Sequence, residues 1–221
     1  MSRPSKTQLA IWGASGHALV VADAILAGTE YDIVGYLDDV NVDRRNETFG
    51  GNTILGGREA LAGLLRDGVR RIVIAFGNCS ARIAAGDFLR SQGFELPTII
   101  HPRAVIGNRT TIGEGCYIGA GVVIDPECAI GRLVIVNNGA IICHHSVLAD
   151  GAHICPGVSI AGKAHVGRGS WLGVGSCVRD GVSIGAGSFI GAGSVVVKDI
   201  PDGVMAYGVP ASVRKGIADS F

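Results

Sequence analysis

A six-residue period constrains this chain more than any other feature. From Ala104 to Asp199 the sequence divides without a remainder into 16 hexapeptides. Every third position is Ile, Val or Leu, and every first position is Ala, Thr, Cys, Val or Ser. Aliphatic residues at this spacing, with Gly, Asn or Asp at the corners, predict short strands that alternate with turns, three strands to a coil. Because neighbouring strands lie ~4.8 Å apart, we expect a prism of about five coils, roughly 25 Å long.

The first hundred residues follow a different pattern, in which apolar strands alternate with helices. Strands are expected over 9–13, 33–37, 53–55, 71–77 and 97–101, and helices over about 16–26, 58–68 and 79–92. This alternation predicts a parallel, Rossmann-like α/β sheet. We therefore expect a Rossmann-like domain over residues 1–100, a β-helix domain over residues 101–203 and a C-terminal tail over residues 204–221. The Pro and Gly residues of the tail predict an extended segment and a short turn that leave the prism.

Charge and composition exclude several classes of protein. The chain has 19 Lys and Arg against 19 Asp and Glu, so its net charge is zero and a nucleic-acid partner is not expected. The apolar run near the N-terminus is too short for a signal peptide or a membrane span, which predicts a cytoplasmic protein without membrane insertion. The six cysteines form no C-x-x-C pair, so they are expected to be small buried residues.

The segment GASGHA follows a strand and opens a helix, where backbone amides can hold a phosphate. It is not a G-x-G-x-x-G motif, which disfavours a nicotinamide dinucleotide. A nucleotide diphosphate fits better. Gly13 and Gly16 would supply backbone amides, and Ser15 and His17 would supply side-chain donors.

Further polar residues follow two later strands of the same sheet. Asp38 and Asp39 end the strand over 33–37, and Gly77 and Asn78 end the strand over 71–77. The carboxyl ends of parallel strands meet at the edge where such sheets bind ligands. These four residues are therefore candidate substrate-binding residues, although an ordinary acidic turn also explains the Asp pair.

Residues 140–157, AIICHHSVLADGAHICPG, hold the chemistry of the prism. His144 and His145 take the fifth and sixth hexapeptide positions, at a corner, whereas His153 takes a second position, which faces outward from a flat side. Because three hexapeptides make one coil, His144 stacks one coil from Gly162 and His145 stacks on Glu127. Three histidines suggest a metal, a general base or ordinary surface residues. The acidic companions of a metal site are not evident, so no metal is expected.

The motifs together resemble a known family. GASGHA, the strand ending LDD, IAFGN, HP before the first coil, HH followed by HICPG, and the closing YGVPA resemble the nucleotide-amino-sugar N-acetyltransferase and sialic acid O-acetyltransferase family. In plan they are most similar to UDP-4-amino-sugar acetyltransferases of the bacillosamine pathway and to GDP-perosamine N-acetyltransferases. The resemblance implies that the β-helix is left-handed.

The resemblance also implies a homotrimer with active sites between subunits. Acetyl-CoA would lie along the prism between two subunits, and the first domain would hold the nucleotide-linked amino-sugar. His144 would be the general base, His153 would contact the acetyl carbonyl region, and the amide of Gly162 would bind the donor and stabilise the oxyanion. On the nucleotide-sugar side the resemblance places Gly13, Ser15, Gly16, His17, Asp38 and Asp39.

This chain departs from the family at one position. The family follows its base with Asp or Glu, which orients the ring, whereas this chain has His145. Glu127, one coil below His145, is the candidate that would replace the acidic partner through space.

The expected function is acetyl-CoA-dependent N-acetylation of the 4-amino group of a nucleotide-linked 4-amino-4,6-dideoxysugar by direct transfer. O-acetylation of a sialic acid-type sugar is the alternative within the family. A metal-dependent lyase of the carbonic anhydrase type and a non-catalytic nucleotide-sugar-binding protein are the alternatives from other classes. The sequence leaves the nucleotide open among UDP, GDP and dTDP.

Overall fold

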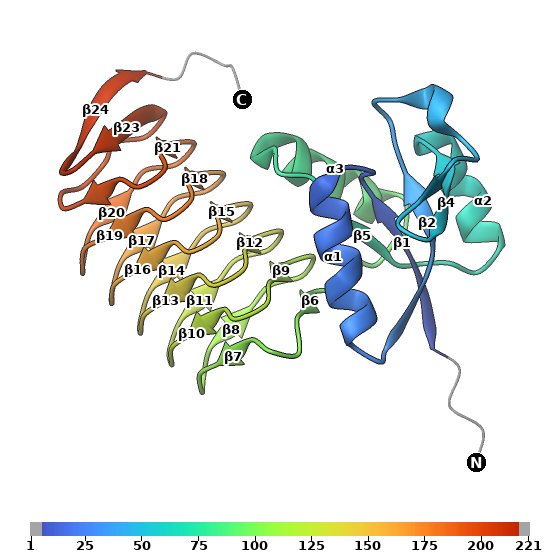
Figure 1. Ribbon diagram of the computed structural model, residues 1–221, viewed down its shortest axis with the longest axis horizontal. Helices are drawn as coiled ribbons and strands as arrows, with labels where there is room; N and C mark the ends of the chain where they lie inside the picture. Colours follow the sequence, from blue (N-terminus) through green and yellow to red (C-terminus); the bar gives the residue numbers. More distant parts are fainter. Residues whose placement is uncertain (1–5, 217–221) are drawn as a thin grey trace.

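The computed structural model describes residues 6–216, which form two parts side by side (Figure 1). An α/β domain extends to the end of α3, and a prism of stacked coils follows it. This is the fold class that the sequence predicted.

The N-terminal sheet has five strands in the order β3-β4-β2-β1-β5, and all of its pairs are parallel except β3-β4. Along β1, Leu9 and Ile11 pack with α1, whereas Ala10 and Trp12 pack with α2 and α3. Both faces of the sheet are therefore covered, which explains the continuous apolar run of this strand. The elements are β1 (Thr7–Trp12), α1 (Gly16–Ala27), β2 (Tyr31–Leu37), η1 (Val42–Arg44), β3 (Thr48–Phe49), β4 (Asn52–Gly56), η2 (Arg58–Ala60), α2 (Leu61–Arg66), β5 (Ile72–Ile74) and α3 (Cys79–Ser91).

Two of the expected strands differ in the structure. β5 ends at Ile74, so residues 75–78 form an irregular turn before α3. The strand expected over 97–101 is the short β6 (Ile99–Ile100), which pairs with β9 of the prism rather than with the N-terminal sheet.

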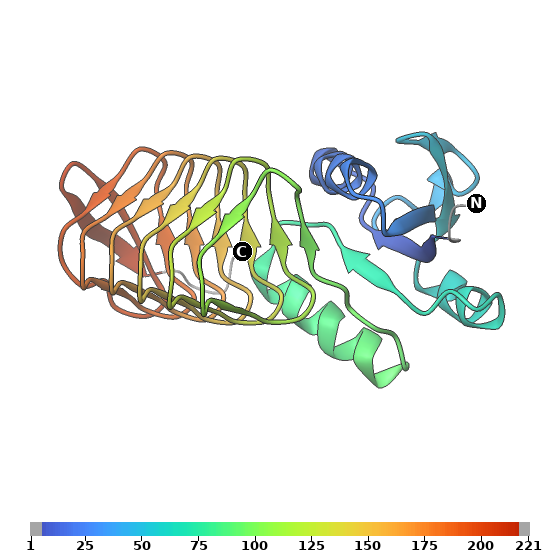
Figure 2. The same ribbon diagram turned by 90° about the horizontal axis from the view of Figure 1, so that it is seen from below.

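The prism consists of three sheets whose strands are all parallel except for the last pair of the chain, and Figure 2 shows its coils stacked along one axis. Paired residues lie three hexapeptides apart, as in Val123 with Ile141. The first prism sheet contains β6, β9 (Tyr117–Ile118), β12 (Ile135–Val136), β15 (His153–Ile154), β18 (Trp171–Leu172), β21 (Phe189–Ile190), β23 (Val204–Gly208) and β24 (Ala211–Gly216). The second contains β7 (Val105–Ile106), β10 (Val123–Ile124), β13 (Ile141–Ile142), β16 (Ser159–Ile160), β19 (Cys177–Val178) and β22 (Val195–Val196). The third contains β8 (Thr111–Ile112), β11 (Ala129–Ile130), β14 (Val147–Leu148), β17 (His165–Val166) and β20 (Ser183–Ile184).

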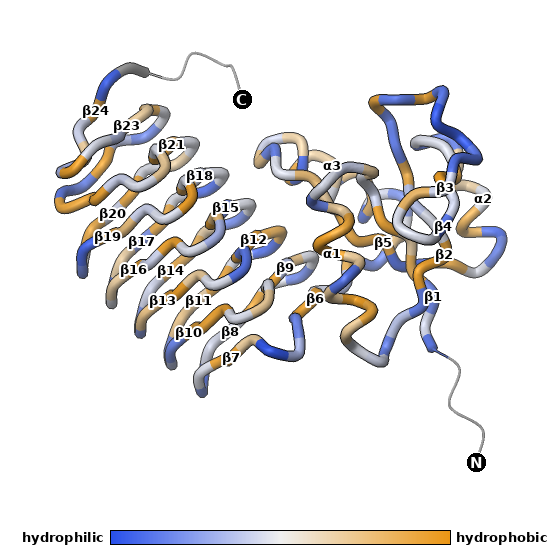
Figure 3. Tube along the Cα trace, viewed as in Figure 1, coloured by the Kyte–Doolittle hydropathy of each residue, from blue (hydrophilic) through white to orange (hydrophobic). Residues whose placement is uncertain are grey.

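The third hexapeptide positions form the interior of the prism. Side chains such as Ile118, Ile142 and Ile154 are fully buried in one continuous core, and Figure 3 shows apolar colour returning in each coil. Small first-position side chains complete this core and bond to the backbone. The hydroxyl of Ser170, for example, donates to the carbonyl of Gly185 at 2.6 Å. This pattern explains the restriction to small residues at the first position, because a larger side chain would not fit beside the stacked aliphatic row.

The cysteines of the prism take three different hexapeptide positions: Cys116 and Cys128 the first, Cys143 and Cys155 the fourth, and Cys177 the second. Cys116, Cys128 and Cys155 are buried, as expected, and Cys143 is partly buried. Cys177 differs, because it takes a second position and is exposed.

One corner of the prism carries unusual backbone conformations. The sixth hexapeptide position has a positive φ, which glycine adopts without strain. On the corner between the second and third sheets, however, four successive coils place a larger residue there. These residues are Arg109, Glu127, His145 and Lys163, with φ of 60°, 65°, 60° and 59°. Non-glycine residues in this region cost free energy, and such strain gathers at functional sites.

The C-terminal segment does not leave the prism, in contrast to the expectation from its Pro and Gly residues. β23 pairs in parallel with β21, and β24 returns antiparallel to β23. Residues 217–221 of the expected tail lie outside the described part of the chain. Between residues 6 and 216, no helix has the length and apolar character needed to cross a bilayer.

Candidate active site

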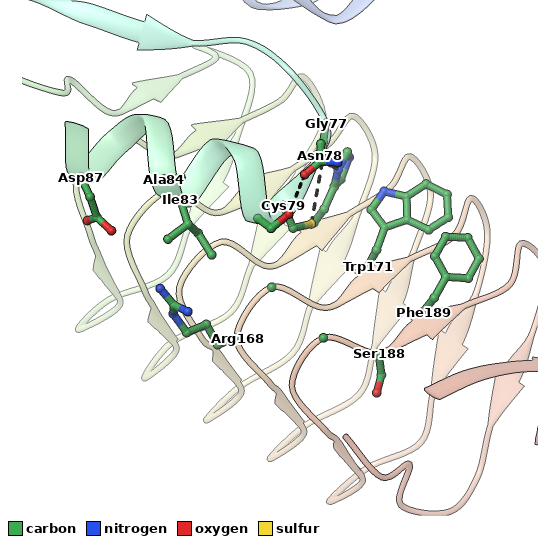
Figure 4. Close-up of a pocket in the computed structure, with 14 residues that line it drawn as sticks. Gly77, Asn78, Cys79, Ile83, Ala84, Asp87, Arg168, Trp171, Ser188 and Phe189 are labelled. Carbon is green, nitrogen blue, oxygen red and sulfur yellow. Dashed lines mark hydrogen bonds between the residues drawn. The ribbon is translucent and has the colours of Figure 1, made fainter. Parts of the chain in front are cut away.

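A pocket of about 1090 Å³ lies between the start of α3 and the first prism sheet (Figure 4). The turn before α3 and the first two turns of the helix form one wall. The prism forms the other wall with His153, Trp171 and Phe189, which follow one another at intervals of one coil. The lining residues are Gly77, Asn78, Cys79, Ser80, Ile83, Ala84, Asp87, His153, Arg168, Gly169, Trp171, Gly187, Ser188 and Phe189.

Rings stacked along the first prism sheet give the pocket an aromatic wall. The Trp171 and Phe189 rings are stacked, with centroids 4.2 Å apart and planes inclined by 19°. His153 meets Trp171 edge to face at 5.9 Å. Because second-position side chains point away from the prism interior, these rings face the α/β domain. Such a wall suits an apolar arm or a flat ring of a ligand.

His153 points outward from the prism, as expected, but the α/β domain covers it. Its side chain is only 7% exposed, and its Nδ1 lies 3.1 Å from the carbonyl oxygen of Gly77. A carbonyl can only accept, so Nδ1 carries the proton, and Nε2 of the neutral ring is unprotonated. Burial and the nearby charge of Arg82 lower the pKa of His153 to about 4, which keeps the ring neutral at neutral pH.

Arg82 joins the two parts of the chain behind the turn that lines the pocket, through the carbonyl of Gly77. Its side chain is fully buried, and its guanidinium donates to carbonyls of both parts. The acceptors are the carbonyls of Phe76 at 3.1 Å, Gly77 at 2.8 Å, Leu133 at 2.9 Å and Gly151 at 2.7 Å. Burial lowers the pKa of Arg82 from its ordinary value, yet an arginine remains charged in proteins.

At the same carboxyl edge of the N-terminal sheet, next to the turn that follows β5, the GASGHA segment turns from β1 into α1. Gly13 has a φ of 130°, and a side chain there would meet the carbonyl oxygen of Ala75 at 2.6 Å. Ser15 and Gly16 are exposed at the start of α1, and the Ser15 side chain makes no capping bond to the helix. This start of α1 is therefore free to bind an anion through its amides.

His17 faces the prism. Its ring meets Tyr117 edge to face at 5.4 Å, and its Nε2 is buried without a hydrogen-bond partner. Burial, followed by the charge of Arg82, lowers the pKa of His17 to about 4. The His17 ring also lies beside that of His153, with centroids 6.3 Å apart, so this segment and the pocket are neighbours.

Asp38 and Asp39 are engaged in contacts within the α/β domain. Asp38 is 6% exposed and accepts bonds from the amides of Val40 and Asn41, the Asn41 side chain and Arg44. These bonds, together with the charge of Arg44, hold the pKa of Asp38 below its usual value despite the opposing effect of burial. Asp39 accepts from the amide and side chain of Arg58. Asp38 is thus fully enclosed, whereas Asp39 lies at the surface.

A second group of candidate residues, His144, His145 and Gly162, lies on the strained corner between the second and third sheets. The ring of His144 covers Gly162, and a Cβ at Gly162 would lie 2.7 Å from His144 Cε1 and 2.9 Å from its Nε2. Within residues 6–216, the amide of Gly162 donates no backbone hydrogen bond. An exposed imidazole beside an unused amide donor can accept a proton while the amide stabilises a negative charge.

The neighbours of His144 on this corner are His145 and Glu127. Nδ1 of His144 lies 3.1 Å from Nδ1 of His145, so one proton fits between the two rings. Glu127 pairs with Arg109, one coil further down. The structure therefore brings His144, His145 and Gly162 together and directs the carboxylate of Glu127 toward Arg109.

The corner and the pocket lie on opposite sides of one prism. The chain passes from the first sheet to the second and then to the third in every coil, so the corner between the second and third sheets is opposite the first sheet. His144 belongs to that corner, and His153 belongs to the first sheet. The two histidines are separated by half a coil along the sequence. They therefore lie at nearly the same height along the axis, within about half of the ~4.8 Å strand spacing.

No three His, Cys, Asp or Glu side chains in the described part of the chain form a group suited to bind a metal ion. The ring of His144 has a hydrogen-bond contact with the ring of His145, and the ring of His153 has one with the carbonyl of Gly77.

Known proteins share both parts of this architecture. The family model of the PglD N-terminal domain matches residues 8–85, and that of the bacterial transferase hexapeptide (six repeats) matches residues 98–126 and 163–198. With the fold and the histidine corner, these matches define a hexapeptide-repeat acyltransferase. Perosamine N-acetyltransferase from Caulobacter crescentus, solved with CoA and GDP-perosamine, is 36% identical over 97% of this chain and 100% of its own, with a TM-score of 0.88. The chain belongs to this family of sugar N-acetyltransferases and is an acetyl-CoA-dependent acyltransferase.

Other relatives agree with this assignment. The acetyltransferase domain of PglB from Neisseria gonorrhoeae, solved with acetyl coenzyme A, is 34% identical over 95% of this chain and 100% of its own, with a TM-score of 0.88. WeeI from Acinetobacter baumannii shares the fold, with 23% identity over 94% of this chain and 100% of its own and a TM-score of 0.82. A galactoside O-acetyltransferase of Lactococcus lactis is 44% identical over 50 residues, so the chain spans only 24% of the length of that enzyme.

Sequence reasoning did not identify Trp171, Phe189 or the role of Arg82. The two rings could have been found, because they take second positions one and two coils after His153. The contacts of Arg82 could not, because its acceptors are backbone carbonyls, which no side-chain motif records.

Proposed function

We propose that the protein transfers the acetyl group of acetyl-CoA to the 4-amino group of a nucleotide-linked 4-amino-4,6-dideoxysugar, with His144 as general base. The arrangement of His144 over Gly162 carries this proposal, because it puts a proton acceptor beside an unused amide donor. The relative solved with GDP-perosamine supports the substrate class.

The reaction is a direct transfer. The amine nitrogen of the sugar attacks the thioester carbonyl, and Nε2 of His144 accepts the proton that the nitrogen loses. The carbonyl oxygen becomes an oxyanion, which accepts a hydrogen bond from the amide of Gly162. The C–N bond remains, the C–S bond breaks, and His144 returns the proton to the sulfur of CoA as it leaves.

His145 orients the base in this proposal. Since the Nδ1 atoms lie 3.1 Å apart, the N–H at Nδ1 of His144 donates a hydrogen bond to Nδ1 of His145, and Nε2 of the neutral His144 ring is then unprotonated. The acidic residue that the resemblance leads us to expect is thereby replaced by a neutral acceptor. Glu127 acts on this corner through Arg109 rather than through the rings.

The active site combines the corner of one subunit with the pocket of a neighbour in a homotrimer. Within one chain the corner and the pocket face opposite sides, so a single chain cannot bring them to one substrate. A threefold axis parallel to the prism preserves heights along the axis. It therefore places His144 of one subunit level with the pocket residue His153 of the next.

In this arrangement the aromatic wall receives the arm of acetyl-CoA, and the turn at Gly77 and Asn78 faces the sugar. The exposed start of α1 holds the diphosphate through the amides of Ser15 and Gly16. Asp39, at the surface, is the carboxylate of the pair that remains accessible to the nucleobase.

The test is mass spectrometry of UDP-, GDP- and dTDP-linked 4-amino-sugars after incubation with acetyl-CoA. One sugar is expected to gain an acetyl group with the wild type, and His144→Ala is expected to reduce the rate by about 10²–10⁴. The matched control is His165→Ala, which removes an exposed histidine from another side of the prism. No acetylation of any amino-sugar would contradict the proposal.

The short match to a galactoside O-acetyltransferase favours a second candidate, O-acetylation of a sugar. The same panel with a 4-hydroxyl in place of the 4-amino group separates the two. Acetylation of the hydroxyl sugar alone would establish the second candidate.

A further inference from the structure

We propose that Arg82 is a positioning residue of the active site. It fixes the carbonyl of Gly77 against the prism, and this carbonyl holds His153 with an unprotonated Nε2 toward the pocket, as an acceptor for an N–H group of the ligand. The inference rests on the proposed function, because it assumes that the pocket is where the substrates bind.

A buried arginine is an unfavourable choice if its only role is to hold the two parts of the chain together. Burial of a charge is unfavourable unless its donors are satisfied, and an apolar residue of similar size is often as stabilising. Here the guanidinium meets four carbonyls and, at 3.7 Å, the sulfur of Cys79. No carboxylate in the described part of the chain forms an ion pair with it. An apolar residue could not donate to those carbonyls, so only a donor such as Arg82 can hold them in place.

The carbonyl of Gly77 links Arg82 to the pocket. Its oxygen accepts from Arg82 at 2.8 Å and from Nδ1 of His153 at 3.1 Å, and more weakly from the thiol of Cys79 at 3.8 Å. The Leu133 and Gly151 carbonyls bind the same guanidinium from the prism side. The turn before α3 therefore cannot shift along the prism without breaking bonds to Arg82.

The tautomer of His153 decides what the pocket can bind. With the proton on Nδ1, the neutral ring presents Nε2 as a hydrogen-bond acceptor, and no hydrogen bond within residues 6–216 uses that nitrogen. The burial of the ring and the charge of Arg82 oppose a second proton. An acceptor recognises an N–H group, whereas the acetyl carbonyl expected from the resemblance needs a donor. The two N–H groups available are an amide of the pantetheine arm of acetyl-CoA and the amine of the sugar.

The first arm of the test is ¹⁵N NMR of the histidine rings in the wild-type protein without substrates. Protonated and unprotonated ring nitrogens have well-separated ¹⁵N shifts, and exposed His165 provides an internal reference. We expect Nδ1 of His153 to be protonated and Nε2 unprotonated at neutral pH. A proton on Nε2 would overturn the proposal.

The second arm uses Arg82→Lys, whose ammonium cannot reach all four carbonyls. We expect His153 to show a mixture of tautomers and one KM to rise roughly tenfold, with a smaller change in kcat. A rise in the KM of acetyl-CoA identifies the pantetheine amide as the ligand group, and a rise in the KM of the amino-sugar identifies the amine. Arg90→Lys is the matched control, because Arg90 lies on the same helix and pairs with Glu114 at the surface.

His153→Asn keeps the proposal testable if Arg82→Lys does not fold. With Nδ2 of Asn donating to Gly77, its acceptor oxygen takes the place of the His153 Cδ2 atom and does not reach the position of Nε2, so the same KM should rise. Unchanged KM values for both substrates would contradict the role of His153, and a folded Arg82→Lys with an unchanged tautomer would contradict that of Arg82. The NMR measurement uses no substrate, so it does not depend on the proposed function. If only the proposed function is wrong, His153 will show the expected tautomer while the enzyme acetylates none of the amino-sugars.

Discussion

At the residue scale, the contact between His144 and Gly162 leaves no room for another atom. We expect Gly162→Ala to reduce kcat by about 10², because the new methyl group would push the ring from its position. A Cβ there would lie 2.7 Å from the ring, closer than carbon atoms approach one another. Steady-state kinetics with the acetylated sugar provide the measurement.

Gly63→Ala is the matched control, since a Cβ on that helical glycine meets its nearest side-chain atom only at 3.7 Å. The midpoint of thermal unfolding should be nearly the same for the two variants. If Gly162→Ala keeps the wild-type kcat, the ring does not act from its position over Gly162.

The single residues show how far sequence reasoning extends. His144 and Gly162 could be paired from the stacking of successive coils alone, because a repeat fixes neighbours in space. Asp38 shows what the pattern leaves out: a carboxylate at the end of a strand predicts a ligand contact, and nothing in the sequence records that the following turn folds back and encloses it. The ligand contact of Asp38 stays a prediction. The position of His17 was also not predictable in detail, since nothing in GASGHA records that its ring packs against Tyr117 of the prism.

At the scale of elements, the start of α3 depends on Asn78. Its side-chain oxygen accepts from the amide of Ala81 at 2.9 Å and from the Ser80 hydroxyl at 2.9 Å. Asn78→Ala should lower the free energy of unfolding by about 1 kcal/mol, which denaturant unfolding can measure. It should also weaken substrate binding, because the same turn lines the pocket.

Asn78→Asp keeps a capping oxygen at the same place and serves as the control. Equal stability of the Ala and Asp variants would mean that the cap contributes nothing. Equal stability with unequal KM values would separate the role of Asn78 in the pocket from its role in the helix.

The elements of the prism were easier to predict than those of the α/β domain. Every two-residue strand follows from the aliphatic third position, because burial of that side chain repeats at each step. The ends of β5 and β6 were harder. An apolar run such as RIVIAFG does not show where pairing stops, and the short β6 pairs with a strand one coil later rather than with the N-terminal sheet.

At the scale of the whole molecule, the positions of corner and pocket predict complementation between inactive variants. His144→Ala disables the corner, and Trp171→Glu places a charge in the aromatic wall of the pocket. If each site takes its corner and its pocket from different subunits of a ring, co-expression of the two should give roughly a quarter of wild-type activity. Activity of the purified mixed oligomers provides the measurement.

Each variant expressed alone is the control and should remain inactive. Mixed oligomers without activity would mean that one chain supplies the complete site, which would contradict the arrangement between subunits.

The uninterrupted coils also fix the spacing of side chains along the axis of the prism. Each added coil moves every later side chain along the axis by one strand spacing. The distance between two equivalent side chains can therefore change only in steps of ~4.8 Å. Deletion or insertion of one whole coil above Phe189 would leave the heights of His144, His153 and Trp171 unchanged. The same change between β6 and His144 would shift the corner and the pocket wall together relative to the α/β domain. A substrate of different length could therefore be accommodated by a change in the number of coils, without substitution of the residues that contact it.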